Sequence, residues 1–209
     1  MASPLIPSQK PTRAEIAQAQ GRTVPDLIAP GLPVLFSGIN PSLYSAAVGH
    51  HFARPGNRFW PALRAAGITP RLFAPTEGGL LLGLGCGITN VVDRATTAAA
   101  ELSVAEMIAG GEALAAKIRR FSPAFIAFLG ITTYRSAFGR PRAVIGEQPE
   151  RLGESRIWVL PNPSGLNAHY QVADLGRLFA ELWVASEAAA HQRELEARIG
   201  PDLPGPARD

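Results

Sequence analysis

Residues 34–40 read VLFSGIN and are followed directly by Pro41 and Ser42. The run begins apolar, which indicates a strand buried inside a sheet, and the Asn-Pro pair ends that strand. Residues 156–163, RIWVLPNP, repeat this pattern and lead into Ser164. The tripeptide Asn-Pro-Ser therefore follows two predicted strands that lie far apart in the sequence.

The chain between and around these strands alternates strand and helix patterns. Two more strands are predicted at 87–93, GITNVVD, and 125–130, FIAFLG. The predicted helices cover 12–20, 57–66, a short glycine-rich stretch after Thr76, 103–120 with a capping box, 131–138 and 172–199. This alternation predicts an α/β fold with a mainly parallel sheet of four to five strands and helices on both faces.

Polar residues gather where these strands end. Asn40 follows the first strand, Asn162 the last, and Asp93 ends the second. Parallel strands all end at one edge of their sheet, and ligands bind there. The two amides can position a water or bind a carbonyl, but they cannot act as nucleophiles or strong bases. Asn-Pro pairs also form simple turns, so a purely structural role stays open at this point.

Length and composition indicate one globular domain. The chain has 209 residues, of which 46% are apolar and 18% charged. We expect a lead-in at 1–23, the domain at 24–187, and a helix extension with a proline-containing tail at 188–209. No apolar run approaches the roughly 18–20 residues that span a bilayer, and the N-terminus lacks a signal-peptide pattern. An intracellular protein is expected.

Several classes of site are disfavoured by the sequence. Cys86 is the single cysteine, which excludes an internal disulfide and a four-cysteine cluster. His50 and His51 are adjacent, so their side chains point different ways and do not suggest a metal site. No phosphate-binding Walker loop is present. Phe52 could stack on a planar ligand or pack its loop onto the core, and both interpretations stay open.

Two long motifs carry a family resemblance. GINPSLYSAAVGHHFARPGNRFW at 38–60, followed by VLPNPSGLN at 159–167, resembles the mismatch-specific uracil-DNA glycosylase/thymine-DNA glycosylase family of the uracil-DNA glycosylase superfamily. The resemblance extends over roughly residues 24–185 and includes GITNVVDRAT at 87–96. It implies a three-layer α/β/α sandwich that flips a base out of DNA and cleaves its bond to deoxyribose. No cofactor or metal is implied.

The resemblance assigns roles by position. Asn40 matches the catalytic asparagine that positions the attacking water, and Phe52 matches the aromatic residue that stacks on the extruded base. Leu166 matches the wedge that fills the gap left in the duplex. The remaining expected substrate-binding positions are Ile39, Ser42, Ser45 and Asn162, and the remaining expected DNA-binding positions are Arg54, Arg58, Ser164, Gly165 and Asn167.

The sequence departs from the family pattern at three points. Ser42 stands where the family usually has glycine, and Asn167 replaces a small hydroxyl residue. The first motif contains no acid, so our hypothesis gives Asp93 a catalytic role beside Asn40. The alternative is that Asp93 pairs with a nearby arginine such as Arg94 or caps a turn.

Three functions are therefore weighed. The preferred one is a monofunctional glycosylase that removes uracil, with thymine or adducted cytosine as further candidates, from mispaired double-stranded DNA. The second is a non-catalytic binder of damaged or single-stranded DNA on the same fold. The third is an α/β phosphoester hydrolase or nucleotide-binding protein. We expect a cytoplasmic, nucleoid-associated monomer from a bacterium, with no membrane partner.

Overall fold

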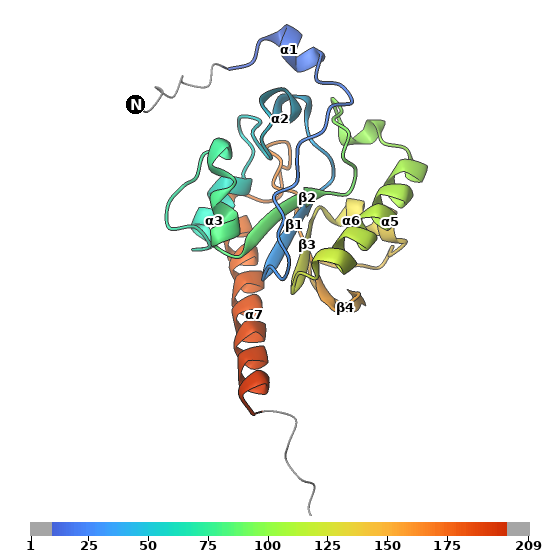
Figure 1. Ribbon diagram of the computed structural model, residues 1–209. Helices are drawn as coiled ribbons and strands as arrows, with labels where there is room; N and C mark the ends of the chain where they lie inside the picture. Colours follow the sequence, from blue (N-terminus) through green and yellow to red (C-terminus); the bar gives the residue numbers. More distant parts are fainter. Residues whose placement is uncertain (1–9, 200–209) are drawn as a thin grey trace, which may run out of the picture.

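The computed structural model describes residues 10–199 and has a five-stranded sheet at its centre (Figure 1). The strand order is β2-β1-β3-β5-β4. The strands are β1 (Val34–Gly38), β2 (Cys86–Asn90), β3 (Phe125–Leu129), β4 (Gly146–Leu152) and β5 (Ser155–Leu160). Residues 1–9 of the expected lead-in and residues 200–209 of the expected tail lie outside the described residues.

Four of the five strands run parallel. β1 pairs with β2 on one side and β3 on the other, and β3 pairs with β5, each in parallel register. Only β4, at the edge, runs antiparallel to its neighbour β5. The predicted mainly parallel α/β sheet is confirmed, and the carboxyl ends of its four parallel strands lie at one edge.

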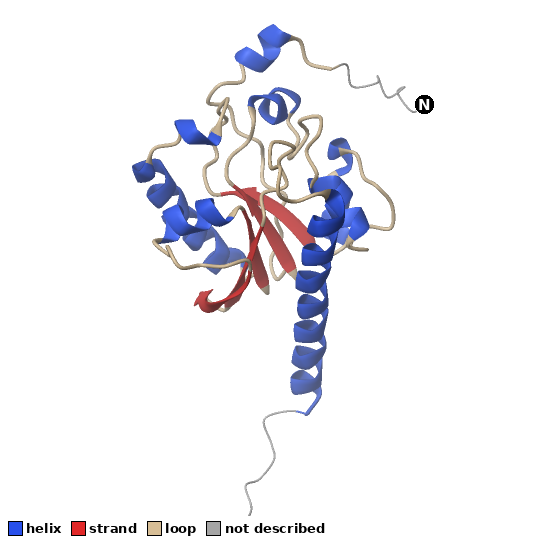
Figure 2. Ribbon diagram, turned by 180° about the vertical axis from the view of Figure 1, so that it is seen from behind, coloured by secondary structure: helices blue, strands red, loops and turns tan. Residues whose placement is uncertain are grey.

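Helices cover both faces of this sheet, as Figure 2 shows. One face carries α3 and α7, which pack against each other, and the other carries α5 and α6. The longer helices are α1 (Arg13–Ala17), α2 (Leu43–Val48), α3 (Phe59–Ala65), α4 (Leu80–Gly83), α5 (Val104–Phe121), α6 (Ile131–Phe138) and α7 (Val172–Ile199), with single 3-10 turns at Pro75–Glu77 and Ala99–Glu101. None of the helices within residues 10–199 could cross a membrane.

Alternation along β1 explains the three layers. Val34 and Phe36 join one hydrophobic cluster with α3 and α7, whereas Leu35 joins a second cluster with α5 and α6. All three side chains are 0% exposed. Successive side chains of a strand point to opposite faces, so three consecutive buried apolar residues require cover on both faces of the sheet.

Two elements were not predicted, for physical reasons. β4 reads GEQPERL and is mostly polar with an internal proline, which is tolerated only at a sheet edge. α2 has just six residues and begins at the first Asn-Pro-Ser, where the Asn-Pro pair predicts the end of a strand and carries no helix signal. The capping box predicted at Ser103 and Glu106 is confirmed: the Ser103 hydroxyl accepts from Glu106 N–H, and the Glu106 carboxylate accepts from Ser103 N–H.

Part of the expected lead-in packs onto the domain. Thr12 and Glu15 form a capping box that starts α1. Beyond this helix Ala19 is 0% exposed and shares a small apolar cluster with Ala46 of α2 and with Ala95. The N-terminal segment therefore lies against the loops at the carboxyl edge of the sheet.

The contact between α3 and α7 generates a stability prediction. A Cβ built on Gly176 of α7 would lie 2.7 Å from the Cβ of Ala65 in α3, so only glycine fits there. We expect Gly176→Val to lower the free energy of unfolding by about 2 kcal/mol through overpacking, despite its gain in helix propensity. The control Ala188→Val, at an exposed position of the same helix, should lower it only by the helix-propensity difference, less than about 1 kcal/mol. Urea denaturation measures the free energy of unfolding of both variants. If Gly176→Val lowered it no more than Ala188→Val does, the close approach of α3 and α7 would be contradicted.

Candidate functional site

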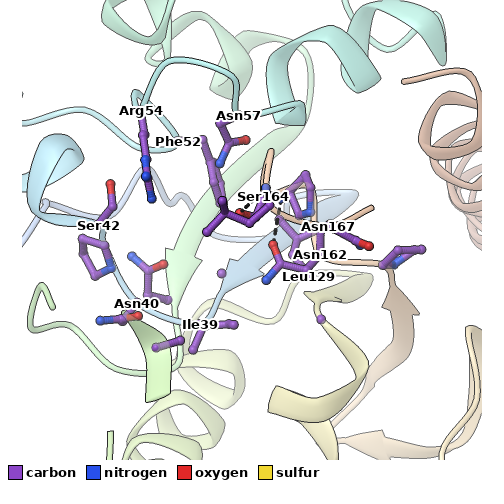
Figure 3. Close-up of a pocket in the computed structure, with 18 of the residues that line it drawn as sticks. Ile39, Asn40, Ser42, Phe52, Arg54, Asn57, Leu129, Asn162, Ser164 and Asn167 are labelled. Atoms are coloured by element: carbon purple, nitrogen blue, oxygen red, sulfur yellow. Dashed lines mark hydrogen bonds between the residues drawn. The ribbon is translucent and has the colours of Figure 1, made fainter. Parts of the chain in front are cut away.

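A cavity of about 710 Å³ opens at the carboxyl edge of the sheet. Its walls come from the loops that follow β1, β2, β3 and β5. Figure 3 shows residues of the first motif, Ile39, Asn40 and Ser42, on one side and residues of the second motif, Asn162, Ser164 and Asn167, on the other. Its volume falls within the roughly 300–1,000 Å³ of small-molecule sites, so a single nucleotide base fits.

The side chain of Asn40 is held in one orientation. Its Nδ2 donates to the backbone oxygen of Arg94 at 3.0 Å and to Thr96 Oγ1 at 2.7 Å. A backbone carbonyl only accepts, so the group facing Arg94 must be the NH₂ end of the amide. No hydrogen bond described for residues 10–199 involves Asn40 Oδ1, and Asn40 lines the cavity. Its carbonyl oxygen is therefore available as an acceptor there.

Thr96 completes this arrangement. Its hydroxyl donates to the backbone oxygen of Ala98 at 2.9 Å, which turns a lone pair toward the Asn40 amide. Thr96 is 1% exposed and lines the same cavity. Sequence reasoning missed this residue because a single threonine beyond a strand carries no distinctive signal.

Phe52 is placed by a chain of aromatic contacts. Its backbone φ is 52°, an unusual conformation for an aromatic residue, and its ring stacks on Phe59 with centroids 4.2 Å apart and planes at 29°. Phe59 in turn packs edge-on against Phe36 of β1 at 5.4 Å. Since Phe52 is half-buried and lines the cavity, its ring is a flat apolar surface anchored to the core.

Gly38 allows Asn90 and Phe52 to approach the backbone closely in the cavity wall. A Cβ on Gly38 would lie 2.5 Å from Asn90 Oδ1 and 3.2 Å from the Phe52 ring. Asn90 is 4% exposed, lines the cavity, and has no side-chain hydrogen bond among those described for residues 10–199. A buried amide with free bonding capacity can recognise the donor and acceptor groups of a base edge.

Two serines tie α2 to the segment that carries Phe52. Ser42 is the N-cap of α2, where its Oγ accepts from Ser45 N–H at 3.2 Å. The two hydroxyls lie 3.1 Å apart, and Ser45 Oγ also accepts from the Ala53 N–H at 3.1 Å. Both serines line the cavity, as does Ile39. The departure at Ser42 therefore adds a helix cap as well as a hydroxyl in the wall.

The second motif folds back on itself. Residues 162–170 form what we call the Asn162 loop. Asn162 Oδ1 accepts from the Ser164 N–H at 2.9 Å, and its backbone oxygen accepts from Asn167 Nδ2 at 2.9 Å. Asn162, Ser164 and Asn167 line the cavity. Leu166, between them, is 79% exposed, which makes it the most exposed large apolar side chain among the described residues.

The two arginines predicted to bind DNA are placed differently. Arg54 is exposed and lines the cavity, and its side chain has no hydrogen bond or ion pair among those described for residues 10–199. Arg58 is partly buried, and its guanidinium donates to backbone oxygens of the Asn162 loop. Gly165 of that loop approaches Gly56 so closely that a Cβ on Gly165 would lie 2.6 Å from the Gly56 oxygen.

Asp93 lies apart from this cavity. β2 ends at Asn90, three residues before Asp93 and not at it, and Asp93 is absent from the cavity walls. Its carboxylate is 64% exposed and lies 4.0 Å from Lys117 Nζ, which has a closer partner in Asp26 at 2.5 Å. The structure therefore gives no geometric support to a role for Asp93 beside Asn40. The alternative partner Arg94 pairs with Glu106 at 2.6 Å instead.

His51 lines the cavity as a neutral side chain. It is 4% exposed, and burial lowers the pKa of its imidazole from the usual value. Its Nε2 lies 2.9 Å from the backbone oxygen of Pro25, which can only accept, so Nε2 carries the proton. This bond fixes the tautomer and leaves Nδ1 as the ring nitrogen that can accept a hydrogen bond.

The cavity holds no strong acid, base or amine. None of the described residues that line it is aspartate, glutamate, lysine or cysteine. Within residues 10–199 no group of three or more histidine, cysteine, aspartate or glutamate residues could hold a metal ion. Besides amides, hydroxyls and backbone groups, the side chains there that can donate or accept hydrogen bonds are those of His51, His169, Arg54 and Tyr170.

Comparison with known proteins agrees with this architecture. The model of the Uracil DNA glycosylase superfamily matches residues 25–185, which is most of the chain and includes every wall of the cavity. A solution NMR structure of a Methanosarcina acetivorans protein, described provisionally as a uracil DNA glycosylase, is 17% identical. It superposes with a TM-score of 0.47 over 78% of this chain and 98% of that one, a likeness too weak to add to the assignment. On the family match, the chain belongs to the uracil DNA glycosylase superfamily.

Proposed function

We propose that the protein is a monofunctional DNA glycosylase that removes uracil from mispaired DNA and leaves an abasic site. The observation that carries this proposal is the fixed amide of Asn40, whose Oδ1 has no described hydrogen-bond partner, in the wall of a base-sized cavity that Phe52 and Asn90 also line. Membership of the superfamily supports a glycosylase role in general. The preference for uracil in a mispair is the further step that we infer from the two motifs.

The proposed substrate is a base rotated out of the duplex. A base inside a duplex is out of reach of the cavity, so it must be extruded, which costs a few kcal/mol and least at a mispair. The extruded uracil would stack on Phe52, and the Asn90 amide would bind its polar edge. The exposed Leu166 would enter the gap left in the base stack and oppose return of the base.

The absence of a carboxylate from the described cavity walls favours a dissociative mechanism. As the bond between base and sugar lengthens, negative charge develops on the uracil oxygens and positive charge on the sugar. Hydrogen-bond donors near the uracil stabilise the leaving anion. Water then attacks the sugar cation, a step that needs an oriented water more than a strong base. Asn40 Oδ1 can accept a hydrogen bond from that water and so aim the water's lone pair at the sugar, while the proton that the water loses on attack passes to the departing uracil anion or to solvent.

The same composition favours water as the nucleophile. An amine nucleophile would form a Schiff base and could cut the DNA strand, but no described residue in the cavity walls is a lysine. The amine of Lys117 is bound to Asp26 instead. This supports hydrolysis alone, that is, a monofunctional enzyme.

The first test compares uracil excision by the wild type and Asn40→Ala. Single-turnover reactions use G·U, A·U and single-stranded uracil oligonucleotides in EDTA, and alkali reveals abasic sites. We expect Asn40→Ala to slow excision at least about 100-fold because it loses the water-orienting acceptor. The Kd for the G·U duplex should change less than about threefold, since this contact belongs to the transition state.

The isosteric variant Thr96→Val serves as a matched control. It keeps the volume of the wall but removes the acceptor that holds the Asn40 amide, so its excision rate should fall between those of the wild type and Asn40→Ala. Binding of uracil DNA without any excision by the wild type would indicate the non-catalytic binder. Activity that EDTA abolishes would indicate a metal-dependent hydrolase instead.

A second prediction concerns the exposed apolar side chain of the Asn162 loop. Leu166→Ala should slow excision from the G·U duplex about 30-fold, because the variant can no longer fill the gap left by the base. Excision from single-stranded DNA, where no stack must be opened, should stay within about threefold of the wild type. Equal losses on the two substrates would contradict the wedge role.

A further inference from the structure

Arg58 directs both of its terminal guanidinium nitrogens and its backbone N–H at one loop. Its Nη1 lies 2.7 Å from the backbone oxygens of both Asn167 and Tyr170, and its backbone N–H donates to the Pro163 oxygen at 2.8 Å. Two longer contacts, Nη1 to the Ser164 oxygen at 3.5 Å and Nη2 to the Gly165 oxygen at 3.4 Å, complete the set. One guanidinium thus gathers four carbonyl oxygens of the Asn162 loop around itself.

Apolar packing holds the two ends of this loop but not its tip. Pro163 is buried and Tyr170 packs against the main hydrophobic core, whereas Leu166, the one large aliphatic side chain of the loop, is 79% exposed. Between the two ends, short-range hydrogen bonds link Asn162, Ser164, Leu166, Asn167 and His169. Apolar packing, the usual source of loop order, is not available to a side chain that must stay exposed until it meets its partner.

Four carbonyl oxygens that converge on one point need a donor with matching geometry. The planar guanidinium offers five N–H groups in a fixed fork, whereas a lysine ammonium is a compact charge on a flexible stem. Among the ion pairs described for residues 10–199, none involves Arg58. The guanidinium therefore binds carbonyl oxygens of the loop, and no carboxylate among the described residues pairs with it.

We propose that Arg58 is a positioning residue that preforms the Asn162 loop with Leu166 projecting, before DNA binds. The proposal rests on the proposed function, because it explains how the wedge is presented. A preformed loop loses less conformational freedom on binding, so more of the contact energy remains to extrude the base. Arg58 then acts on the duplex reaction through the loop and not through a phosphate contact.

The first test measures the loop without DNA. Amide hydrogen exchange across 163–170 is compared between the wild type, Arg58→Met and Arg58→Lys. We expect exchange at least about tenfold faster in Arg58→Met, because the loop opens without its central donor. Arg58→Lys keeps the charge but not the fork, so it should also exchange faster than the wild type. This readout needs no activity, so it is independent of whether the protein is a glycosylase.

The second test measures the ratio of excision rates on G·U duplex and single-stranded uracil DNA. For Arg58→Met the ratio should fall about 30-fold, as expected for Leu166→Ala, with single-strand excision within about threefold of the wild type. A general folding defect would lower both rates together. Arg54→Met is the matched control: its side chain is exposed and without a described partner, so it should weaken binding of both DNAs and leave loop exchange unchanged.

The outcomes separate the proposals. If Arg58→Met and Arg58→Lys exchange like the wild type, or if Arg58→Met slows excision from both DNAs by the same factor, the positioning role is overturned. Weaker binding of both DNAs with unchanged loop exchange, as expected for Arg54→Met, would then indicate a phosphate contact. If the loop exchanges faster but the wild type excises no uracil, the loop role stands and the proposed function fails.

Discussion

The parallel pairing of β1 with both of its neighbours is the constraint on which the site depends. β1 pairs with β2 over residues 34–38 and with β3 over residues 34–37, and β5 follows on the far side of β3. Asn40 and Asn162 each lie two residues beyond the last residue of their strands, Gly38 and Leu160. Strands are spaced by about 4.8 Å, so two strands that flank a third bring these loops to opposite sides of one base-sized cavity.

The same tripeptide performs opposite tasks at its two positions. Asn40 donates with its amide nitrogen and keeps its oxygen free, whereas Asn162 uses its oxygen to hold the Ser164 N–H. Ser42 caps a helix, and Ser164 Oγ accepts from the Leu166 N–H within a turn. The two tripeptides make different hydrogen bonds because their neighbours differ. The first copy lies against the Arg94–Thr96 segment, and the second lies beside the Arg58 guanidinium.

The strand pattern and both motifs predicted the layers of the fold and most of the cavity walls from sequence. The prediction of the site was less accurate where the predicted end of a strand was wrong. The apolar run 87–93 was interpreted as one strand, which put Asp93 at the sheet edge, but β2 ends at Asn90, and Asn90 is the polar side chain that reaches the cavity. Arg58 looked like a phosphate ligand because the sequence does not show that four distant carbonyl oxygens will surround it.

The central claim is that one cavity receives an extruded uracil while the two motifs act from opposite sides. Its most direct test is a crystal structure of the protein bound to a G·U duplex whose uridine carries a 2′-fluorine, which slows cleavage by destabilising the sugar cation. We predict uracil stacked on Phe52, Leu166 inside the duplex, and Asn40 Oδ1 facing the sugar with its bonds to Arg94 and Thr96 intact. Uracil still paired within the helix, or bound outside this cavity, would contradict the account.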